Sequence, residues 1–279
     1  MSNKLFVIFF RAWSFAHYFF RAKTKYNVHS PLVYEFILNV LEEDKWYYSF
    51  SELKALRKEL LQVEKRIDVE DFGVGSQVIH ARSRKIKDIA RTSLSAPYFC
   101  QVLFSLVHWL KPEKVLELGT SLGVSTLYMS KANAHSAIVS IEGCSSIAEN
   151  ARNIFKLYQA NNIKVVTGNF DDVLQTALDE LQIVQLFVID GNHQKEATLR
   201  YFEFCLKNAD LSAVFVFDDI YWSKEMSEAW QTIKLHTKTK LTIDIFQYGI
   251  VFLQNDFKEK QHFTLIDSKY KFWNTGLWG

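Results

Sequence analysis

The stretch V-L-E-L-G-T-S-L-G-V-S-T, from Val115 to Thr126, decides the fold. Its apolar start is typical of a buried parallel strand, with the acid Glu117 near the strand's end. Glycines then let the backbone turn tightly, and hydroxyl side chains precede an expected helix whose first N–H groups have no partner within that helix. The residues of this turn are Gly119, Thr120, Ser121, Gly123 and Ser125. A strand, a glycine-bearing turn and a helix predict a nucleotide-type crevice in an open α/β sheet.

Two other motifs compete for the same turn. It is not the G-x-G-x-x-G fingerprint, which makes a nicotinamide or flavin cofactor a poor choice. It does contain G-x-S-x-G, with Ser121 at the centre, which is the nucleophile elbow of serine hydrolases. A hydrolase also needs an acid and a histidine on separate loops, whereas Asp190 and His193 stand only three residues apart. The hydrolase is therefore kept as an alternative.

Composition places the chain among folded globular proteins. Of its 279 residues, 48% are hydrophobic and 15% aromatic, which is enough for a sizeable core. The net charge of +2 carries no message about partners, and no nucleic acid is expected. Cys100, Cys144 and Cys205 are odd in number, widely spaced and free of any C-x-x-C pair. They predict buried free thiols in a reducing compartment, so we expect a cytoplasmic location.

The N-terminal segment is apolar but does not read as a signal peptide or a membrane span. Its run from Leu5 to Phe10 ends at Arg11, which is too short for either. Polar residues fall on one stripe of a helix over residues 4–25, and apolar residues cover the rest; the stripe is Lys4, Arg11, Ser14, Tyr18, Arg21 and Lys25. We expect the wide apolar face to pack on its own chain or on a second copy in a homodimer. Peripheral membrane contact is the alternative.

Further helices are expected before the central strand. Ser30 and Pro31 suit the start of a helix through about residue 41, another begins near Ser51, and a third covers 97–110. D-F-G-V-G-S at 71–76 resembles a phosphate loop, but residues 65–70 are too charged for the buried strand that such a loop needs. The basic residues that follow are read as a solvated helix face: Arg82, Arg84, Lys85, Lys87 and Arg91. Residues 1–95 are thus predicted to be a helical N-terminal region and 96–279 the main domain.

From Val115 onward, strands and helices alternate, which predicts a parallel sheet. The expected strands are 114–118, 137–142, 163–167, 184–190, 213–218, 241–246 and 250–254. The last two are separated by too few residues for a crossover helix and must form an antiparallel hairpin. The prediction is an α/β, Rossmann-like sheet of seven strands, six parallel and the seventh antiparallel, with an N-terminal helical extension.

Residues 113 to about 255 resemble a class I S-adenosylmethionine (SAM)-dependent methyltransferase, and E-L-G-T-S-x-G-x-S is similar to the glycine loop of the O-methyltransferase branch. By this resemblance, Glu117 and the backbone around Gly119 hold the methionine part of the cofactor. Glu142 takes both ribose hydroxyls, and a carboxylate at a strand end is chemically suited to a vicinal diol. The resemblance also places Asn169 and Phe170 against the adenine, with Asp171 near its amino group.

The chemistry is expected where the fourth and fifth strands end. Asp190, Asp218 and Asp219 follow those strands and should converge on one crevice. Three neighbouring carboxylates repel one another unless a cation, protons or a basic partner compensates. Oxygen ligands favour Mg²⁺, with Mn²⁺ or Ca²⁺ as alternatives. The competing interpretation is that Asp190 only orients the cofactor pocket while one of the Asp pair caps the next helix.

The spacing is similar to that of metal-dependent O-methyltransferases of the catechol and macrolide-sugar kinds. Where the catechol type has a lysine base three residues after the first metal aspartate, this chain has His193, as the macrolide-sugar group does. Asp219 also departs from the catechol Asp-Asn pattern, so catechol itself is a poor substrate prediction. The resemblance implies that His193, whose ordinary pKa is about 6.5, takes the acceptor's proton while the metal binds substrate oxygen.

We therefore expect a methyltransferase (EC 2.1.1.-) that uses SAM and a divalent metal to methylate oxygen on a small hydroxylated molecule. A non-catalytic cofactor-binding or regulatory protein on the same fold is the alternative from another class. The acceptor's identity and the segment after residue 255 have no signature that can be interpreted.

Overall fold

The computed structural model describes residues 2–72, 78–254, 259–271 and 273. It is a mixed α/β fold with a mostly parallel sheet of eight strands. The chain divides into two compact units, one made of residues 1–43 with 183–279 and the other of residues 44–182. The predicted boundary at residue 95 falls inside the second of these units. The two units are described in turn.

The 44–182 unit contains the glycine turn and three parallel strands in the order β3-β4-β5. Helices follow each strand, as expected for β-α-β units. α5 packs on α6, and α3 packs on α6 as well. The strands are β3 (Lys114–Leu118), β4 (Ala137–Glu142) and β5 (Ile163–Thr167). The helices are α3 (Tyr48–Leu60), α4 (Ile86–Ser93), α5 (Pro97–Leu110), α6 (Val124–Ala132), α7 (Ser145–Leu157) and α8 (Phe170–Leu181).

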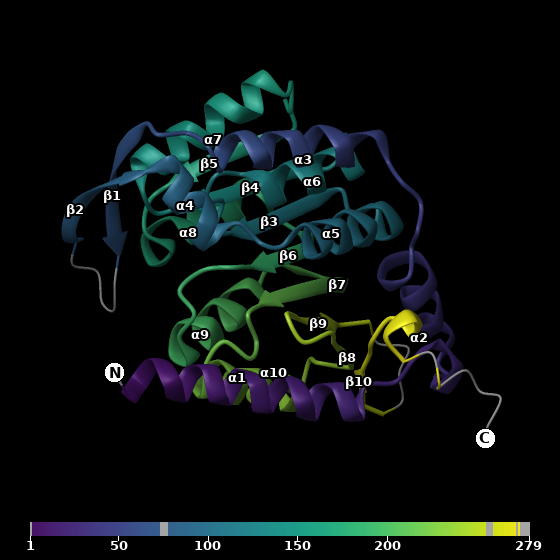
Figure 1. The fold of residues 1–279 in the computed structure, drawn as a ribbon. Coiled ribbons are helices and arrows are strands. Elements are labelled where there is room, and N and C mark those ends of the chain that lie inside the picture. The colour runs from purple at the N-terminus through teal and green to yellow at the C-terminus, as the bar shows by residue number, and fades with distance from the viewer. Residues whose placement is uncertain (1, 73–77, 255–258, 272, 274–279) are drawn as a thin grey trace. The chain divides into compact units, whose positions relative to one another are not determined.

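The predicted helical region contains a β-hairpin. β1 (Arg66–Phe72) and β2 (Val78–Lys85) form a separate two-stranded antiparallel sheet, which packs on α7 (Figure 1). The charge of residues 65–70 excluded a buried parallel strand, but it does not exclude an outlying hairpin. Part of the basic run, through Lys85, is therefore strand and not helix. The D-F-G-V-G-S turn continues into residues 73–77, which lie outside the described residues.

The other unit contributes strands in the order β10-β8-β9-β7-β6. β6 and β7 are parallel, and β9 is antiparallel to both β7 and β8, so the predicted hairpin is confirmed. β10 pairs in parallel with β8, which adds an eighth strand from the segment that the sequence left uninterpreted. The strands are β6 (Val184–Ile189), β7 (Ala209–Asp218), β8 (Leu241–Asp244), β9 (Tyr248–Phe252) and β10 (Gln261–Thr264).

Helices of this unit come from both ends of its sequence. They are α1 (Ser2–Arg21), α2 (Pro31–Phe36), a π-helical turn (Ile37–Leu41), α9 (Lys195–Cys205) and α10 (Lys224–Leu235), with short 3₁₀ turns at Lys25–Asn27 and Ser268–Tyr270. Figure 1 shows α1 lying along the part of the unit formed by α10, β8 and β10. Among the helices in the described ranges, none combines the length and apolar character needed to traverse a bilayer.

α1 packs through its polar stripe, which reverses the simplest expectation from its amphipathic pattern. Ser14 and Tyr18 are buried, and the Tyr18 hydroxyl donates to the carbonyl of Leu265 at 2.5 Å. The backbone of Lys23 continues this anchoring, because its N–H donates to the carbonyl of Thr264. The polar side chains are useful inside because they satisfy backbone groups next to β10.

Candidate functional site

The glycine turn after β3 adopts backbone conformations that require small residues. Gly119 has φ 108° and Gly123 has φ 77°, both in the left-handed region that favours glycine. A Cβ added to Gly123 would lie 2.5 Å from the ring of Phe155, so the turn also has no room for a side chain there. Gly123 is the N-cap of α6 and offers no side-chain cap. The turn therefore brings bare backbone close to the start of α6.

Glu117 lies beneath this turn and is 1% exposed. Its carboxylate accepts hydrogen bonds from the hydroxyls of Ser125 at 3.1 Å, Thr126 at 2.6 Å and Ser140 at 2.5 Å. Burial raises the pKa of Glu117, and these hydroxyl groups counteract the shift. Thr120 adds a hydroxyl contact to Ser140. Glu117 thus links β3, β4 and α6. The hydrogen-bond partners described for its carboxylate are side chains of the protein itself.

Glu142, the last residue of β4, is held by two backbone N–H groups. Ser121 N–H donates to Oε2 at 2.8 Å, and Cys144 N–H donates to Oε1 at 3.0 Å. Burial raises the pKa of Glu142, although hydrogen bonds from the backbone N–H groups of Cys144, Ser121 and Gly143 favour its charged form. The side chain is half-buried. Since a carboxylate has more than two acceptor positions, Glu142 can still accept hydrogen bonds from a bound ligand.

Ser93 is a residue of this site that the sequence did not reveal. It ends α4, and its hydroxyl lies 2.9 Å from the hydroxyl of Ser121 in the glycine turn. Ser121 itself has φ 48°. No sequence signal connects the two serines, because Ser93 lies in a region without a motif. α4, which belongs to the 44–182 unit as the glycine turn does, thus contributes a hydroxyl group at the edge of that turn.

The residues predicted for the adenine lie at the start of α8. Asn169 caps the helix, since its side chain accepts from the N–H of Asp171 at 3.2 Å. Phe170 is half-buried and Asp171 is exposed. The N–H of Gly168 donates to the carbonyl of Glu142 at 3.0 Å, which places this helix start next to the ribose-binding candidate. Asn169 therefore has a structural role besides the one predicted for it.

A second group of candidates gathers in the other unit, where β6 and β7 end. A side-chain hydrogen bond links Asp190 to Asp218, and His193 Nε2 lies 3.7 Å from Asp190 Oδ1. Asp218 is 5% exposed. Burial, and after it repulsion from Asp219, raises the pKa of Asp218 to about 6. The predicted convergence of these residues is thus observed within this unit.

Gln247 joins this acidic cluster and was not predicted as a site residue. Its side-chain amide donates to Asp218 Oδ1 at 2.5 Å and to Asp219 Oδ1 at 2.7 Å. The N–H of Asp219 also donates to Asp218 Oδ1, at 2.8 Å. Asp219 has φ 54°, a conformation that turns the chain sharply after β7. The only hint in the sequence was the position of Gln247 in the β8–β9 turn.

The amide of Gln247 bears on the predicted metal. One amide nitrogen stands between two carboxylates, where a cation would have to coordinate both. Within the described residues, no group of three or more His, Cys, Asp or Glu side chains is arranged to hold an ion. As arranged, the side chains do not fit a divalent metal, and the mutual repulsion is relieved by hydrogen bonds and protonation instead.

Ser121 does not have the surroundings of a hydrolase nucleophile. Its hydroxyl contacts Ser93 and its N–H contacts Glu142. In the described part of the chain, no histidine is a hydrogen-bond partner of Ser121. A nucleophilic serine needs a base within hydrogen-bond reach, so the hydrolase alternative has no geometric support.

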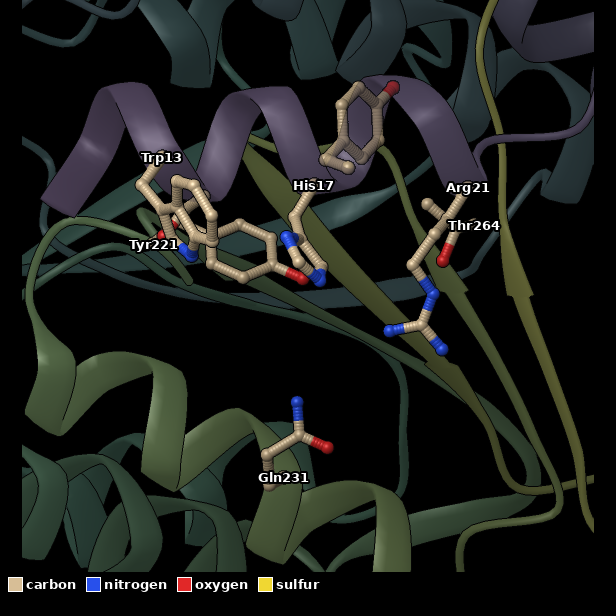
Figure 2. A pocket seen from close by; sticks show the side chains of 8 residues that line it. Trp13, His17, Arg21, Tyr221, Gln231 and Thr264 are labelled. Atoms are coloured by element: carbon tan, nitrogen blue, oxygen red, sulfur yellow. The ribbon is translucent and has the colours of Figure 1, made fainter.

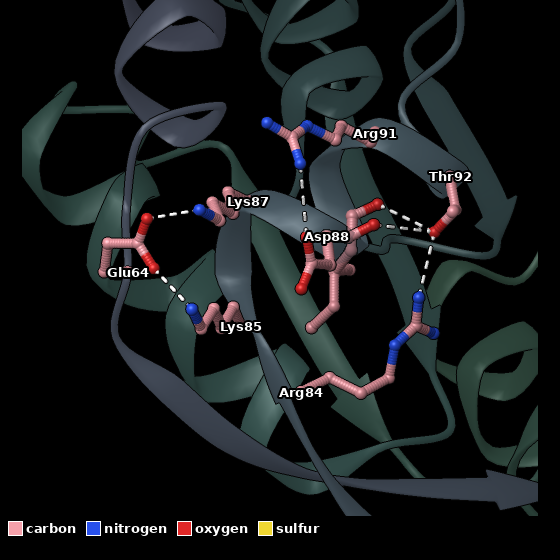
Figure 3. A network of polar contacts seen from close by, with 8 residues as sticks. Glu64, Arg84, Lys85, Lys87, Asp88, Arg91 and Thr92 are labelled. Carbon is pink, nitrogen blue, oxygen red and sulfur yellow. Dashed lines mark hydrogen bonds and ion pairs between the residues drawn. The ribbon is translucent and has the colours of Figure 1, made fainter.

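Part of the basic run forms a network of ion pairs and hydrogen bonds with Glu64, Asp88 and Thr92 (Figure 3). Lys85 and Lys87 both pair with Glu64, and Arg91 lies 3.4 Å from Asp88. Hydrogen bonds from Lys85 and then Lys87 lower the pKa of Glu64 to about 2. Arg84 donates to the hydroxyl of Thr92 at 3.2 Å. These contacts are typical of an exposed charged surface.

The strand order within each unit, the positive-φ turn after β3 and the acidic residues after β6 and β7 define the class I methyltransferase fold. Residues 116–220 match a family model described as a methyltransferase domain. The resemblance expected from the sequence is thus confirmed for the fold and for this domain.

Solved structures agree with this fold. An O-methyltransferase from Bacillus cereus in complex with SAH has a TM-score of 0.53 at 16% identity, over 79% of this chain and 96% of that chain. The SAH-bound methyltransferase PaMTH1 from Podospora anserina has a TM-score of 0.56 at 14% identity, over 76% and 89%. TomG from Streptomyces achromogenes, an O-methyltransferase of tomaymycin synthesis in complex with SAM, has a TM-score of 0.51 at 18% identity, over 79% and 93%. The search of curated proteins gives no sequence match.

Proposed function

We propose that this protein is a SAM-dependent methyltransferase that methylates oxygen on a small hydroxylated molecule. The observation that carries the proposal is the carboxylate of Glu142, fixed by the N–H groups of Ser121 and Cys144 beside a turn of positive-φ glycines. This arrangement suits a ribose diol next to a backbone that a nucleoside can approach closely. SAM- and SAH-bound relatives in fold support the choice of cofactor.

The glycine turn is the proposed binding site for the methionine part of SAM. Gly119 and Gly123 leave the backbone open, Thr120 and Ser125 are fixed by contacts to Ser140 and Glu117, and Ser121 is fixed by Glu142. Glu117 acts here by holding the turn in shape, because its oxygens already accept three hydroxyl groups. Asn169 and Phe170 remain the candidates for the adenine.

When bound, SAM supplies a methyl group that its sulfonium has already activated, so the protein's task is to orient and deprotonate the acceptor hydroxyl. We assign the proton to His193. Its Nε2 faces Asp190 at 3.7 Å, which leaves Nδ1 to accept the proton. The carboxylate of Asp190 lies next to the imidazole and is assigned the role of orienting it.

The divalent cation expected from the sequence is not part of this mechanism. Asp218 and Asp219 already share the amide of Gln247, and no step is assigned to a metal. Their role in the proposal is to maintain the negative charge and the geometry around Asp190. The magnesium requirement expected from the sequence is therefore not carried into this proposal.

The experiment is methyl transfer from SAM carrying a labelled methyl group to a panel of small phenols, catechols and sugars. The expected result is label in at least one hydroxylated acceptor and SAH as the second product. A protein that binds SAM but labels no acceptor of any class would favour the alternative, a non-catalytic cofactor-binding protein. Label on nitrogen or carbon in preference to oxygen would overturn the assignment to hydroxyl acceptors.

A further inference from the structure

One face of α1 carries large apolar side chains that are mostly exposed in the described chain. They recur at helical spacing along its outer side, and their exposed fractions are high: Leu5 68%, Phe6 61%, Phe9 68%, Trp13 60% and Phe20 81%. Ala12 and Ala16 belong to the same stripe. Isolated exposed apolar residues are ordinary, but a continuous stripe of aromatic residues marks an interaction surface. We call these seven residues the α1 outer stripe.

Contacts on the opposite side of α1 hold the helix in one orientation, with the α1 outer stripe facing away from the protein. Ser14, Tyr18 and Ala22 are buried, and Tyr18 is hydrogen-bonded to Leu265. Phe15 packs edge-on against Phe246, with ring centroids 5.0 Å apart. Since the helix is held through these contacts, it cannot rotate to bury its outer stripe without losing them. The apolar surface is therefore a stable feature of the folded unit.

The segment that carries the stripe is basic in sequence, with its cations on the other faces of the helix and just after it. The first 34 residues contain Lys4, Arg11, Arg21, Lys23 and Lys25 and no Asp or Glu. Arg11 lies over the ring of Trp222, with its Cζ 4.6 Å from the centroid. Among the described residues, no carboxylate forms an ion pair with Arg21. Lys25 is paired with Glu42 at 2.8 Å, so the exposed cations of this segment that remain for an anionic surface are Arg21 and Lys23.

A cavity of about 230 Å³ opens beside the stripe, between α1 and α10 (Figure 2). In Figure 2, His17 and Arg21 point from α1 toward it, and Gln231 points from α10. Trp13 and Tyr221 complete its aromatic side, while the Tyr221 hydroxyl is already committed to Asp244 at 2.5 Å. Arg21 and Gln231 supply donors that suit a phosphate group at the edge of the stripe.

We propose that α1 docks this protein on an anionic lipid bilayer, with the outer stripe in the interface and Arg21 on a lipid phosphate. The helix would lie in the plane of the membrane surface, as amphipathic helices with Phe, Trp and Leu on one side and cations beside them do. A second copy of the chain is the less favourable occupant. Pairing two such helices would bring two acid-free, positively charged segments together.

The test uses the full chain and sedimentation with vesicles of phosphatidylcholine, alone or mixed with phosphatidylglycerol. The wild type should sediment with the anionic vesicles, and added salt should weaken the binding. Phe6→Ser with Phe9→Ser removes two exposed aromatic side chains and should weaken binding on the order of a hundredfold. Leu235→Ser, a residue 73% exposed at the end of α10, is the matched control and should bind like the wild type.

Charge is tested separately. Arg21→Gln should weaken binding to anionic vesicles about fivefold, whereas Lys54→Gln, an exposed lysine on α3, should have no effect. Thermal unfolding of each variant checks that the fold is kept. Equal sedimentation of wild type and the double Phe variant would overturn the proposal. So would a wild type that ignores anionic vesicles but is a dimer that the double variant dissociates, since a second copy would then be the occupant.

Discussion

The backbone N–H of Ser121 donates to the side chain of Glu142 at 2.8 Å, and this bond fixes the glycine turn to the end of β4. The glycine turn and Glu142, which are expected to contact different parts of one nucleoside, are therefore directly connected by this hydrogen bond. A change in the turn should alter the ribose-binding carboxylate, and loss of the carboxylate should loosen the turn. Both consequences can be measured.

Gly123→Ala should destabilise the protein and weaken cofactor binding together. The new methyl group meets φ 77° and the ring of Phe155 at 2.5 Å, so we expect a loss of about 1 to 3 kcal/mol in the free energy of unfolding. Denaturant unfolding measures this loss. Adding Phe155→Leu should recover part of it by making room, although the positive φ remains costly. An alanine variant as stable as the wild type would show that the turn is not constrained as described.

His193→Ala should slow methyl transfer by about 10² to 10⁴-fold and leave the affinity for SAM unchanged. The imidazole Nε2 lies 3.7 Å from Asp190 Oδ1, and His193 is not one of the residues proposed to bind the cofactor. His135→Ala, at an exposed position in the loop before β4, is the control and should keep full activity. If the His193 variant methylates at the wild-type rate, the proton has another acceptor.

Asp218→Asn should raise stability at alkaline pH. The pKa of Asp218 is raised from 3.8 to about 6 by burial and by Asp219, so folding favours its protonated form. Its stabilising contribution is complete below about pH 4 and is lost as the pH rises through 6. The uncharged Asn side chain can still accept from Gln247, and we expect a gain of about 1 to 3 kcal/mol at pH 8 and little change at pH 4. Urea unfolding of both proteins at pH 4 and pH 8 measures the difference in unfolding free energy between variant and wild type. A difference that favours the variant less at pH 8 than at pH 4 would contradict the prediction.

Magnesium should have little effect on the resting protein. Because the amide of Gln247 occupies the position between Asp218 and Asp219, millimolar Mg²⁺ or EDTA should leave the melting temperature unchanged. Gln247→Ala exposes two adjacent carboxylates and should create a Mg²⁺-dependent stabilisation that the wild type lacks. A wild type that Mg²⁺ stabilises, with the effect lost in Asp218→Asn, would restore the metal site expected from the sequence.

The sheet was largely predictable because its strands are local apolar runs. β3, β4 and β5 have the predicted bounds, since each run begins and ends at a clear change of residue type. β7 begins at Ala209, four residues before the expected start, because pairing with β6 extends it through polar residues. β10 was missed, since it is stabilised by pairing with β8 and not by an apolar pattern of its own.

The site was predictable where a strand end fixes a residue and not where a distant segment arrives. Glu142 and Asp218 end their strands and Asp190 directly follows one, so the strand pattern was enough to predict them as site residues. Ser93 and Gln247 enter through tertiary packing, which leaves no periodic trace in the sequence. Tertiary packing also explains α1. Its amphipathic pattern predicts that the apolar face is buried, but the hydrogen bond from Tyr18 to Leu265 holds the polar side of the helix against the protein.

Binding of SAM by the glycine turn and Glu142 can be measured by calorimetry. We expect SAM to bind the wild type at a single site and Glu142→Gln to weaken this binding by about 10 to 100-fold, because a charge-assisted contact to the ribose is lost. Glu149→Gln, an exposed acid on α7, should bind SAM like the wild type. A wild type that takes up no SAM, or a Glu142 variant that binds it with unchanged affinity, would show that this turn and carboxylate are not the SAM site.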